Sequence, residues 1–510
     1  MADPTRYLSS KDRSALTPVH AVWELTLACD LKCQHCGSRA GKRRAEELTT
    51  DECLDLVRQL AAMGTREVTL IGGEAYLRRD WLQIIREIRD QGMDCTLQSG
   101  GLHLTEERLE AAVAAGLQAV GLSIDGLEDV HDKLRGVKGS FNAAFNALEG
   151  VKKYGITASV NTQITSLVIP QLRELMHLFI AAGAKNWQIQ LTVAMGRAAD
   201  HPELLLQPFE LLELMPLLAE LYQEGADQGL LLQPGNNIGY FGPYESLWRG
   251  SGDDRVYWTS CNAGENTLGI EADGTIKGCP SLPTSPYAGG NIRDLSLDHI
   301  WWKTDELSIN RERTTEDLWG FCRGCYYADV CKAGCTWTTH VLFGRAGNNP
   351  YCHHRALELS KQGLRERIAQ VEKAPGVPFD HGRFELILEN ADGRDAAAHL
   401  TQPGMDEQPG PTAGSTIGTL PLSGNALVQI GSVRKGRDQK QGKRPPLTGS
   451  ASLIICRGCQ RHVMADTEVC PFCEGNILAL ARQHDRKLRA ARKAYLRLVE
   501  LLEPSARASG

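Results

Sequence analysis

Three cysteines in the stretch ACDLKCQHCGS have the types and spacing that iron chemistry requires. Cys29, Cys33 and Cys36 share one short loop, with the spacing C-x3-C-x2-C. Three thiolates at this spacing suit a 4Fe–4S cluster and leave its fourth iron without a protein ligand. An open position on a metal centre allows a small molecule to bind and be activated. A closed zinc site would need a fourth ligand, and His35 is expected to face away from the cysteines.

A second group of cysteines lies between residues 261 and 352. The spacing is C-x12-G-x4-C, a gap, C-x2-C-x5-C-x3-C, a gap and a last cysteine. Residues 251–355 contain few long apolar runs, which favours a fold held together by metal rather than by a large core. The seven candidate ligands are Cys261, Cys279, Cys322, Cys325, Cys331, Cys335 and Cys352.

A third group lies near the end of the chain. Cys456-x2-Cys459 and Cys470-x2-Cys473 are separated by ten residues. Two paired thiolate turns suit a tetrahedral ion, which favours zinc over iron at this zinc-ribbon-like module. A basic helix is expected to follow it. Together they could recruit an acidic partner, a leader peptide or RNA, or the charges could serve only solvation.

The setting of these cysteines favours metal binding over disulfides. The first residues lack the apolar segment of a signal peptide, and no apolar run of about 18 residues indicates a membrane span. We therefore expect a cytoplasmic protein, and in a reducing compartment clustered cysteines are more often metal ligands. Cys53 and Cys95 stand alone and are expected to be small buried residues.

The elements that position the first cysteine loop follow a repeating pattern. Short apolar strands, turns and amphipathic helices alternate six times from Val22 to about Thr192. This order predicts an α/β fold with a parallel sheet, either curved into a partial barrel or laid open as a doubly wound sheet. In both forms ligands bind at the carboxyl ends of the strands. The predicted strands are 22–28, 67–72, 94–99, 119–125, 157–163 and 186–192.

The rest of the chain divides by composition. Residues 203–225 read as a leucine-rich helix or helix pair used for core packing. From Gly393 to Ser450 there are ten Gly and six Pro, which indicates a flexible linker. From Gly431 onward sixteen Lys and Arg face seven Asp and Glu, so the tail is basic and the remainder acidic. The predicted ranges are an N-terminal lead (1–20), the core (21–200), a helical bridge (201–250), the cysteine-rich domain (251–375), a linker (376–452), the zinc-ribbon-like module (453–476) and a basic helix (477–510).

The first cysteine loop, directly after the first strand, resembles that of the radical S-adenosylmethionine (SAM) superfamily. The resemblance covers roughly residues 20–355 and implies a partial (β/α)6 TIM-like barrel. In that family the open iron of the cluster binds the amine and carboxylate of SAM. One electron then cleaves SAM to a 5′-deoxyadenosyl radical, which abstracts a hydrogen atom from the substrate.

The same resemblance implies contacts to SAM. Gly72, Gly73 and Glu74 match the family's GGE-like motif, which binds the amino group of SAM. Ser123 and Asp125 end the fourth strand, where the family contacts SAM, and Arg135 resembles the partner of the SAM carboxylate. For these last three, capping and surface pairing are the alternative. His35 replaces an aromatic residue of the family, which leaves the adenine contact open; Asn161 and Gln190 point from later strands toward the same end of the sheet.

The second group of cysteines looks like the SPASM extension of radical SAM enzymes. This resemblance implies two auxiliary 4Fe–4S clusters, a nearer one on Cys261, Cys279 and Cys335 and a farther one on Cys322, Cys325, Cys331 and Cys352. The stretch GDDRVYWTS lacks an eighth cysteine found in the fully ligated form. The nearer cluster then has an open iron or a non-cysteine ligand, and we expect an open iron. The alternative is that both clusters only hold the domain together.

The function expected from this resemblance is radical modification of a ribosomally made peptide, by crosslinking, oxidation or epimerisation. The stretches GNNIGYFGPY and TWTTHVLFGRAGNNPYCHHRALEL resemble a subgroup of peptide maturases associated with GDL-motif peptides. Expected partners are the peptide, an external low-potential electron donor and a separate leader-recognition protein, with no membrane or nucleic acid. Alternatives are a folded protein, as in sulfatase maturation, a small-molecule precursor, or a non-catalytic iron–sulfur and zinc protein that binds nucleic acid. The sequence GGEAYLR lacks the dinucleotide fingerprint, which excludes a dehydrogenase.

Overall fold

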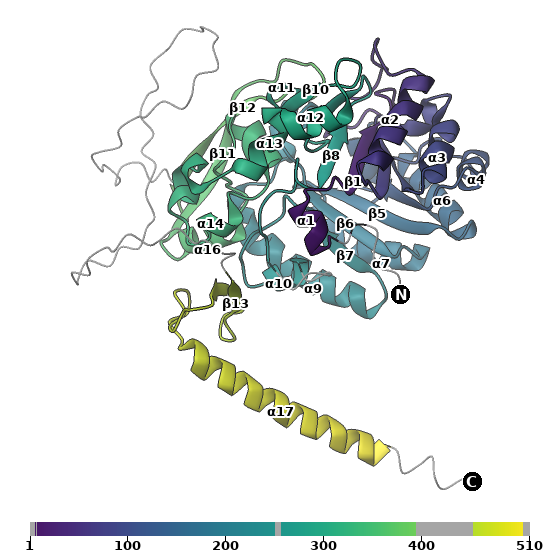
Figure 1. Ribbon diagram of the computed structural model, residues 1–510. Coiled ribbons are helices and arrows are strands. Elements are labelled where there is room, and N and C mark those ends of the chain that lie inside the picture. The colour runs from purple at the N-terminus through teal and green to yellow at the C-terminus, as the bar shows by residue number, and fades with distance from the viewer. Residues whose placement is uncertain (1–5, 7, 250–256, 394–451, 503–510) are drawn as a thin grey trace, which may run out of the picture. The chain divides into compact units, whose positions relative to one another are not determined.

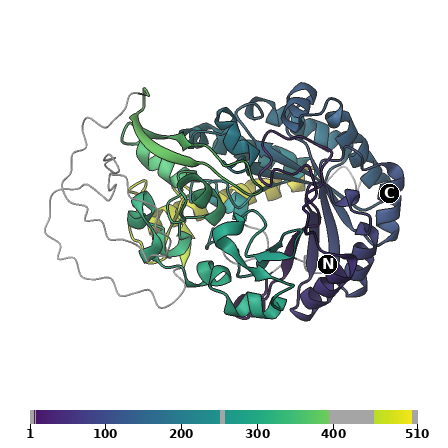
Figure 2. The same ribbon diagram turned by 90° about the horizontal axis from the view of Figure 1, so that it is seen from above.

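The repeating strand–helix pattern forms a curved parallel sheet. The computed structural model describes residues 6, 8–249, 257–393 and 452–502. The six predicted strands are present as β1 (His20–Glu24), β2 (Glu67–Ile71), β3 (Asp94–Ser99), β4 (Ala119–Ser123), β5 (Thr157–Ile164) and β6 (Asn186–Leu191). Each is parallel to the next, so their carboxyl ends share one edge. The α/β prediction is confirmed, and the sheet curves as a partial barrel (Figures 1 and 2).

Amphipathic helices connect the strands. Thr49 caps α2 (Thr50–Ala62) by accepting from the Glu52 N–H, and Glu52 returns a bond to the Thr49 N–H, which satisfies two backbone donors at the helix start. Other helices turn one apolar face to the sheet, as Ile84, Ile85 and Ile88 do from α3. The connecting helices are α3 (Trp81–Asp90), α4 (Glu106–Ala114), α5 (Glu128–Arg135), α6 (Ser140–Lys153) and α7 (Leu172–Ala182), and a short α1 (Ser10–Ser14) precedes β1.

The leucine-rich stretch forms one helix that packs into the core, as predicted. α9 (Leu211–Asp227) buries Leu211, Leu214, Leu218 and Leu221. It is followed by β7 (Leu231–Pro234), which pairs in parallel with β6. The segment predicted as a helical bridge therefore also supplies a seventh parallel strand.

The cysteine-rich region continues the same sheet on its other side. β8 (Thr267–Ile270) pairs in parallel with β1, and the antiparallel strands β9 (Thr275–Lys277) and β10 (Ala288–Asn291) follow it. The result is one ten-stranded sheet in the order β10-β9-β8-β1-β2-β3-β4-β5-β6-β7. Short helices complete the region: α12 (Leu297–Lys303), α13 (Asp305–Glu312), α14 (Ala328–Cys331), α15 (Thr336–Phe343) and α16 (His353–Ser360).

A hairpin corrects the predicted start of the linker at residue 376. β11 (Leu364–Glu372) pairs with β12 (Arg383–Asn390) in an antiparallel ladder. Phe384 is buried, and Glu389 is paired with Arg365 and Arg367 across the hairpin. The Gly- and Pro-rich composition that suggested a linker starts only at Gly393, and residues 394–451 lie outside the described part of the chain.

The chain divides into two units. One holds Met1–Gly239 and Thr259–Lys435, and the other holds Tyr240–Trp258 and Gly436–Gly510. In the second unit β13 (Leu453–Ile455) and β14 (His462–Met464) pair, and α17 (Ile477–Leu502) follows. The ring of His462 contacts Tyr257 at 5.4 Å and Phe241 at 6.5 Å between ring centroids, so the segment around α10 (Glu245–Arg249) belongs to this unit. Among the helices described, none combines the length and apolar character that crossing a bilayer requires.

Candidate functional site

The first cysteine loop leaves the carboxyl end of β1 and lines a cavity of about 330 Å³. Cys29, Cys33 and Cys36 all face this cavity. Each sulfur accepts a hydrogen bond: from the Leu31 N–H to Cys29 at 3.4 Å, from Arg135 Nη1 to Cys33 at 3.6 Å and from the Ala40 N–H to Cys36 at 3.4 Å. Such donors favour an anionic sulfur, which is the form that binds metal.

Burial acts on the same thiols in the opposite direction. It raises the pKa of Cys33 to about 11, and it raises that of Cys29 further. A bare thiolate is therefore unfavourable here, and a positively charged metal centre would compensate for it. Three thiolates that line one cavity fit a cluster with several iron atoms, one of which has no cysteine ligand.

Glycines at two positions allow other backbone segments to approach the first cysteine loop closely. A Cβ at Gly73 would collide with the carbonyl oxygen of Ala28. A Cβ at Gly196, whose φ is +59°, would collide with the carbonyl oxygen of Cys36. Next to it Arg197 donates from its backbone N–H to the Cys36 oxygen at 2.9 Å and from Nε to the Cys33 oxygen at 2.6 Å.

Glu74 lies in the cavity wall directly after the two glycines. Its carboxylate accepts from the Ser99 hydroxyl at 2.6 Å and from the Gly100 N–H at 2.7 Å. Burial raises the pKa of Glu74 to about 8. Its oxygen, the Cys29 sulfur and a carboxylate oxygen of Asp30 lie within 4.8 Å of one another. This corner of the cavity therefore suits a cationic group.

Asp125 organises two other predicted residues. Its carboxylate pairs with Arg135 Nη2 at 2.5 Å and with His35 Nε2 at 2.9 Å. Burial alone would raise the pKa of Asp125, but Arg135 and His35 hold it well below its usual range. Arg135 and His35 line the cavity, whereas Asp125 is fully buried and is absent from its lining. Asp125 therefore reaches the cavity only through these two partners.

Polar side chains at later strand ends complete one wall. Ser123, Asn161 and Gln190, all singled out from the sequence, line the cavity. Gln98 and Gln163 do so too, and Asn161 donates its amide to Gln98. The sequence reasoning missed both glutamines, although Gln98 and Gln163 lie within predicted strands, because polar residues at strand ends are common.

Segments far along the chain also line the cavity. Pro280 and Ser281 follow Cys279, Trp337 follows Cys335, and Phe379 belongs to the loop of the β11–β12 hairpin. Trp337 Nε1 donates to the sulfur of Met195 at 2.9 Å. Adjacency to predicted ligands could have indicated the first three residues; no sequence signal pointed to Phe379.

The hairpin loop is fastened to the cysteine loop. Arg39, three residues after Cys36, donates from Nε to the carboxylate of Asp380 at 2.6 Å and also pairs with Asp200. The carbonyl oxygen of Asp380 accepts from the Gly196 N–H at 2.8 Å. Phe379 is thereby held at the cavity wall, where its ring lies 4.0 Å from Lys277 Nζ.

The cysteines of the second group fall into two sets. Cys261 and Cys279 pack around the same buried core as Trp337, and both raise the pKa of Cys335, in addition to its burial, to about 12. In the other set burial raises the pKa of Cys325, and Cys322 and Cys352 raise it further. The fourth cysteine predicted for that set, Cys331, is buried at the end of α14.

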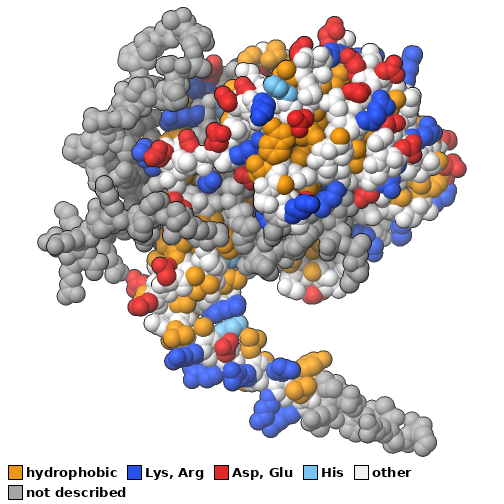
Figure 3. Space-filling view, viewed as in Figure 1, with side chains coloured by type: hydrophobic (Ala, Val, Ile, Leu, Met, Phe, Trp, Pro, Cys, Tyr) orange, Lys and Arg blue, Asp and Glu red, His pale blue; other side chains and the backbone are white. Residues whose placement is uncertain are grey.

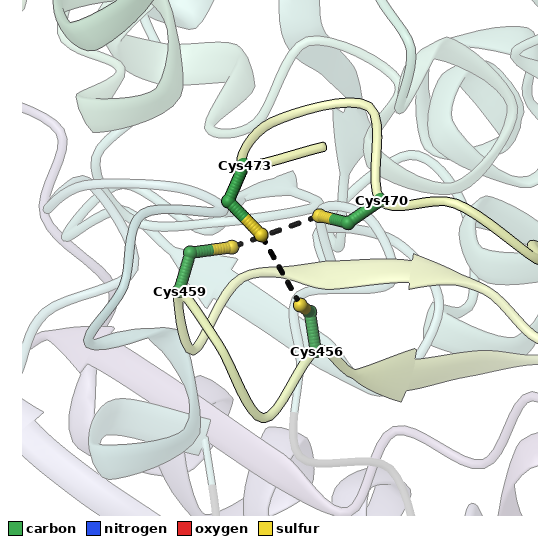
Figure 4. Close-up of side chains that lie close together, drawn as sticks. All are labelled: Cys456, Cys459, Cys470 and Cys473. Carbon is green, nitrogen blue, oxygen red and sulfur yellow. Dashed lines mark hydrogen bonds between the residues drawn. The ribbon is translucent and has the colours of Figure 1, made fainter. Parts of the chain in front are cut away.

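The four cysteines of the terminal module converge on one point (Figure 4). The sulfurs of Cys456 and Cys473 are 3.7 Å apart, as are those of Cys459 and Cys470, and all four lie within 4.8 Å of one another. With Zn–S bonds of about 2.3 Å, a tetrahedral site places its sulfurs about 3.8 Å apart. The module therefore fits a single tetrahedral ion.

Comparison with known proteins adds two domain matches. Residues 23–178 match the family model of the radical SAM superfamily, and residues 261–326 match SPASM, an iron–sulfur cluster-binding domain. The first match contains the loop of Cys29, Cys33 and Cys36. The second contains Cys261, Cys279, Cys322 and Cys325.

Similar proteins differ in what they act on. AdoMet-dependent heme synthase of Methanosarcina barkeri is 28% identical over 65% of this chain and 95% of its own. PqqA peptide cyclase of Ruegeria pomeroyi is 27% identical over 68% of this chain and 91% of its own. The structure of SuiB of Streptococcus suis bound to S-adenosylmethionine is 15% identical, covers 67% of this chain and 78% of its own, and has a TM-score of 0.53. It shares the fold.

Proposed function

Because this chain belongs to the radical SAM superfamily and carries a SPASM domain, we propose that it uses SAM to modify a ribosomally made peptide. One observation carries the proposal: the three cysteines and the residues next to two SPASM cysteines, Pro280, Ser281 and Trp337, line the same cavity. A substrate bound there would lie close to both groups of residues. An external low-potential electron donor and a cytoplasmic location, where thiols stay reduced, are part of the same proposal.

The residues present fit a cluster and SAM. We assign the cluster to Cys29, Cys33 and Cys36; when bound, it supplies the electron that cleaves SAM. Gly72, Gly73 and Glu74 would receive the amino group, since a buried carboxylate favours an ammonium. Arg135 would receive the carboxylate, with Ser123 and His35 lining the same space. Arg135 Nε and His35 Nδ1 are buried and have no hydrogen-bond partner among the described residues, which suits a polar ligand.

We further propose two auxiliary clusters. Cys261, Cys279 and Cys335 would hold the nearer one and would leave one iron without a cysteine ligand. Cys322, Cys325, Cys331 and Cys352 would hold the farther one. A spectrum showing complete cysteine ligation of the nearer cluster would contradict the open iron. Zinc at the terminal module is likewise proposed, because the sulfur spacing suits it.

A peptide substrate is supported by relatives that act on peptides. One relative is named as a peptide cyclase, and SuiB has been solved with its precursor peptide SuiA. Recognition of the peptide could involve a separate leader-binding protein. Membership of the subgroup associated with GDL-motif peptides remains part of this proposal.

The test is the intact mass of a short peptide encoded beside the gene, co-expressed with the enzyme under low oxygen. We expect a mass change that disappears when Cys29, Cys33 and Cys36 are replaced by alanine. A loss of about two hydrogens indicates a crosslink or oxidation; stereochemical analysis detects epimerisation, which leaves the mass unchanged. An unaltered peptide by both measures would contradict the peptide proposal.

A small-molecule precursor is the second candidate. The heme synthase relative is matched over 95% of its length. Here a tetrapyrrole would enter the cavity instead of a peptide. Formation of 5′-deoxyadenosine by the purified, reduced enzyme separates the two, because the true substrate stimulates it. Stimulation by a tetrapyrrole and not by the peptide would favour this candidate.

A further inference from the structure

Helix α17 extends from the four-cysteine module and is exposed over most of its described length. Ile477 and Leu480 in its first turn pack against the core of that module, formed by Cys456, Val463 and Cys470. From residue 485 to residue 498 every side chain is exposed. Long isolated helices gain most of their stability in proteins from packing of an apolar face. We therefore expect another part of a protein to pack against α17.

One line of positions along α17 recurs at alternating spacings of four and three, and all but one of its residues are apolar. These stripe residues are Ile477, Ala481, His484, Leu488, Ala491, Tyr495 and Leu498, of which His484 is the polar member. Leu488, Tyr495 and Leu498 are 55%, 65% and 57% exposed. Figure 3 shows hydrophobic and basic side chains along this helix. A repeat of this kind, with a mean spacing of 3.5 residues, is the pattern of a coiled-coil seam.

The order of large and small residues in the stripe favours one partner helix and one relative orientation of the two helices. We propose that α17 pairs with α17 of a second copy of this chain as an antiparallel coiled coil. In that register Ala481 faces Leu498 of the second copy, His484 faces Tyr495 and Leu488 faces Ala491. Both alanines therefore meet a leucine, which fills those two layers, and His484 meets the ring of Tyr495 in the third.

Charges beside the stripe favour the same direction. In an antiparallel pair, the residues on one side of the stripe face the residues on the same side of the second helix. Asp485 then lies opposite Arg492 of the second copy, and the two-fold symmetry repeats this pair. In a parallel pair Lys487 would face Arg492, and Ala491 would face itself, leaving a gap. Flanking charges set orientation in coiled coils. Most other basic residues, including Arg486, Lys493 and Arg497, lie on the face away from the stripe and stay in water.

The first experiment is sedimentation velocity of the full-length chain. We expect a species with twice the monomer mass of 55.9 kDa. Leu488→Glu places a charge in the central layer and should abolish that species. Leu496→Glu is the matched control: Leu496 is also exposed, at 51%, but lies off the stripe, so the dimer should persist. Circular dichroism of both variants verifies that α17 remains helical. A monomeric wild type, or equal loss in both variants, overturns the proposal.

A charge exchange tests the direction. Arg492→Asp puts two aspartates opposite each other in the antiparallel pair and should raise the dissociation constant roughly threefold or more. Combining it with Asp485→Arg should restore the dimer. In a parallel pair Arg492→Asp would instead face Lys487 and strengthen association. Strengthening by the single variant therefore overturns the antiparallel arrangement, and so does a failure of the double variant to recover.

Discussion

At the scale of single residues, charged side chains at the cavity pair with other side chains inside the protein. Asp125 is fully buried and binds both Arg135 and His35, and Arg135 also donates to the sulfur of Cys33. One guanidinium thus connects a carboxylate with a predicted cluster ligand. Residues of this kind position their neighbours, and conservative changes test them best.

Arg135→Lys keeps the positive charge and removes the planar fork. We expect the dissociation constant of SAM to rise roughly tenfold, because an ammonium cannot hold a carboxylate in two places. Equilibrium binding of SAM to the cluster-loaded protein measures this. Arg293→Lys, in a surface ion pair with Glu52, is the control and should leave SAM binding unchanged. Equal affinities for wild type and Arg135→Lys would remove Arg135 from the proposed site.

Glu24 predicts a pH dependence of stability. Burial raises its pKa to about 7, although Arg44 lies 3.2 Å away. Between about pH 4.5 and 7 the unfolded chain releases this proton and the folded chain retains it, so stability falls as pH rises. Glu24→Gln removes that proton exchange. Thermal unfolding measured from pH 5 to 8 should show a steeper fall for the wild type; parallel curves would contradict the expected protonation of Glu24.

At the scale of elements, the position of the cysteine loop depends on close backbone approaches. Gly196 packs its Cα against the carbonyl of Cys36. Asp380, in the loop of the hairpin, accepts a hydrogen bond from Arg39. These supports come from β6, its following turn and the β11–β12 hairpin. They lie more than 150 residues from the loop that they hold.

Gly196→Ala should distort the loop and reduce the iron bound per chain after reconstitution. Gly155→Ala is a matched control, because Gly155 also has a positive φ, +72°, but a Cβ there meets open space. Both variants carry the strain of a left-handed alanine, roughly 1–2 kcal/mol. Only Gly196→Ala adds the collision with Cys36, so a similar iron content in both would refute this role.

At the scale of the whole molecule, the two kinds of candidate metal site differ in their surroundings. The terminal sulfurs lie 3.7 Å apart in two pairs and suit one ion, whereas the cysteines near the first strand line a cavity. The two kinds of site belong to different units of the chain. Loss of one metal should therefore leave the other in place.

Cys459→Ser tests that independence. We expect bound zinc to fall from about one per chain to near zero, because three thiolates hold the ion much less tightly. Iron content should stay at the wild-type value. Elemental analysis of the purified protein measures both metals. Iron in place of zinc in the wild type, or parallel loss of both metals, would contradict the assignment.

The sequence predicted the strands and the cysteine loops, which depend on short stretches of neighbouring residues. The six strands begin within two residues of their predicted positions, because apolar runs and turns are local signals. The cysteine spacings likewise indicated the three residues that line the cavity and the four whose sulfurs converge near the end of the chain. The contributions of β8 to the barrel sheet and of Phe379 to the cavity escaped prediction, since both arise from contacts between residues hundreds of positions apart. The linker was placed too early because the loop before β12, residues 373–382, is itself rich in Gly and Pro.

The pairing of β8 with β1 has a consequence for how this protein can be divided. A fragment ending before residue 259 would present the bare edge of β1, with its unpaired backbone groups, to other chains. The radical SAM segment is therefore not a separable module, although its sequence match ends at residue 178. Exchanging SPASM domains between relatives would succeed only if the incoming strand matches the register His20–Thr267 through Trp23–Ile270. In this protein the segments that match the two family models contribute strands to one sheet.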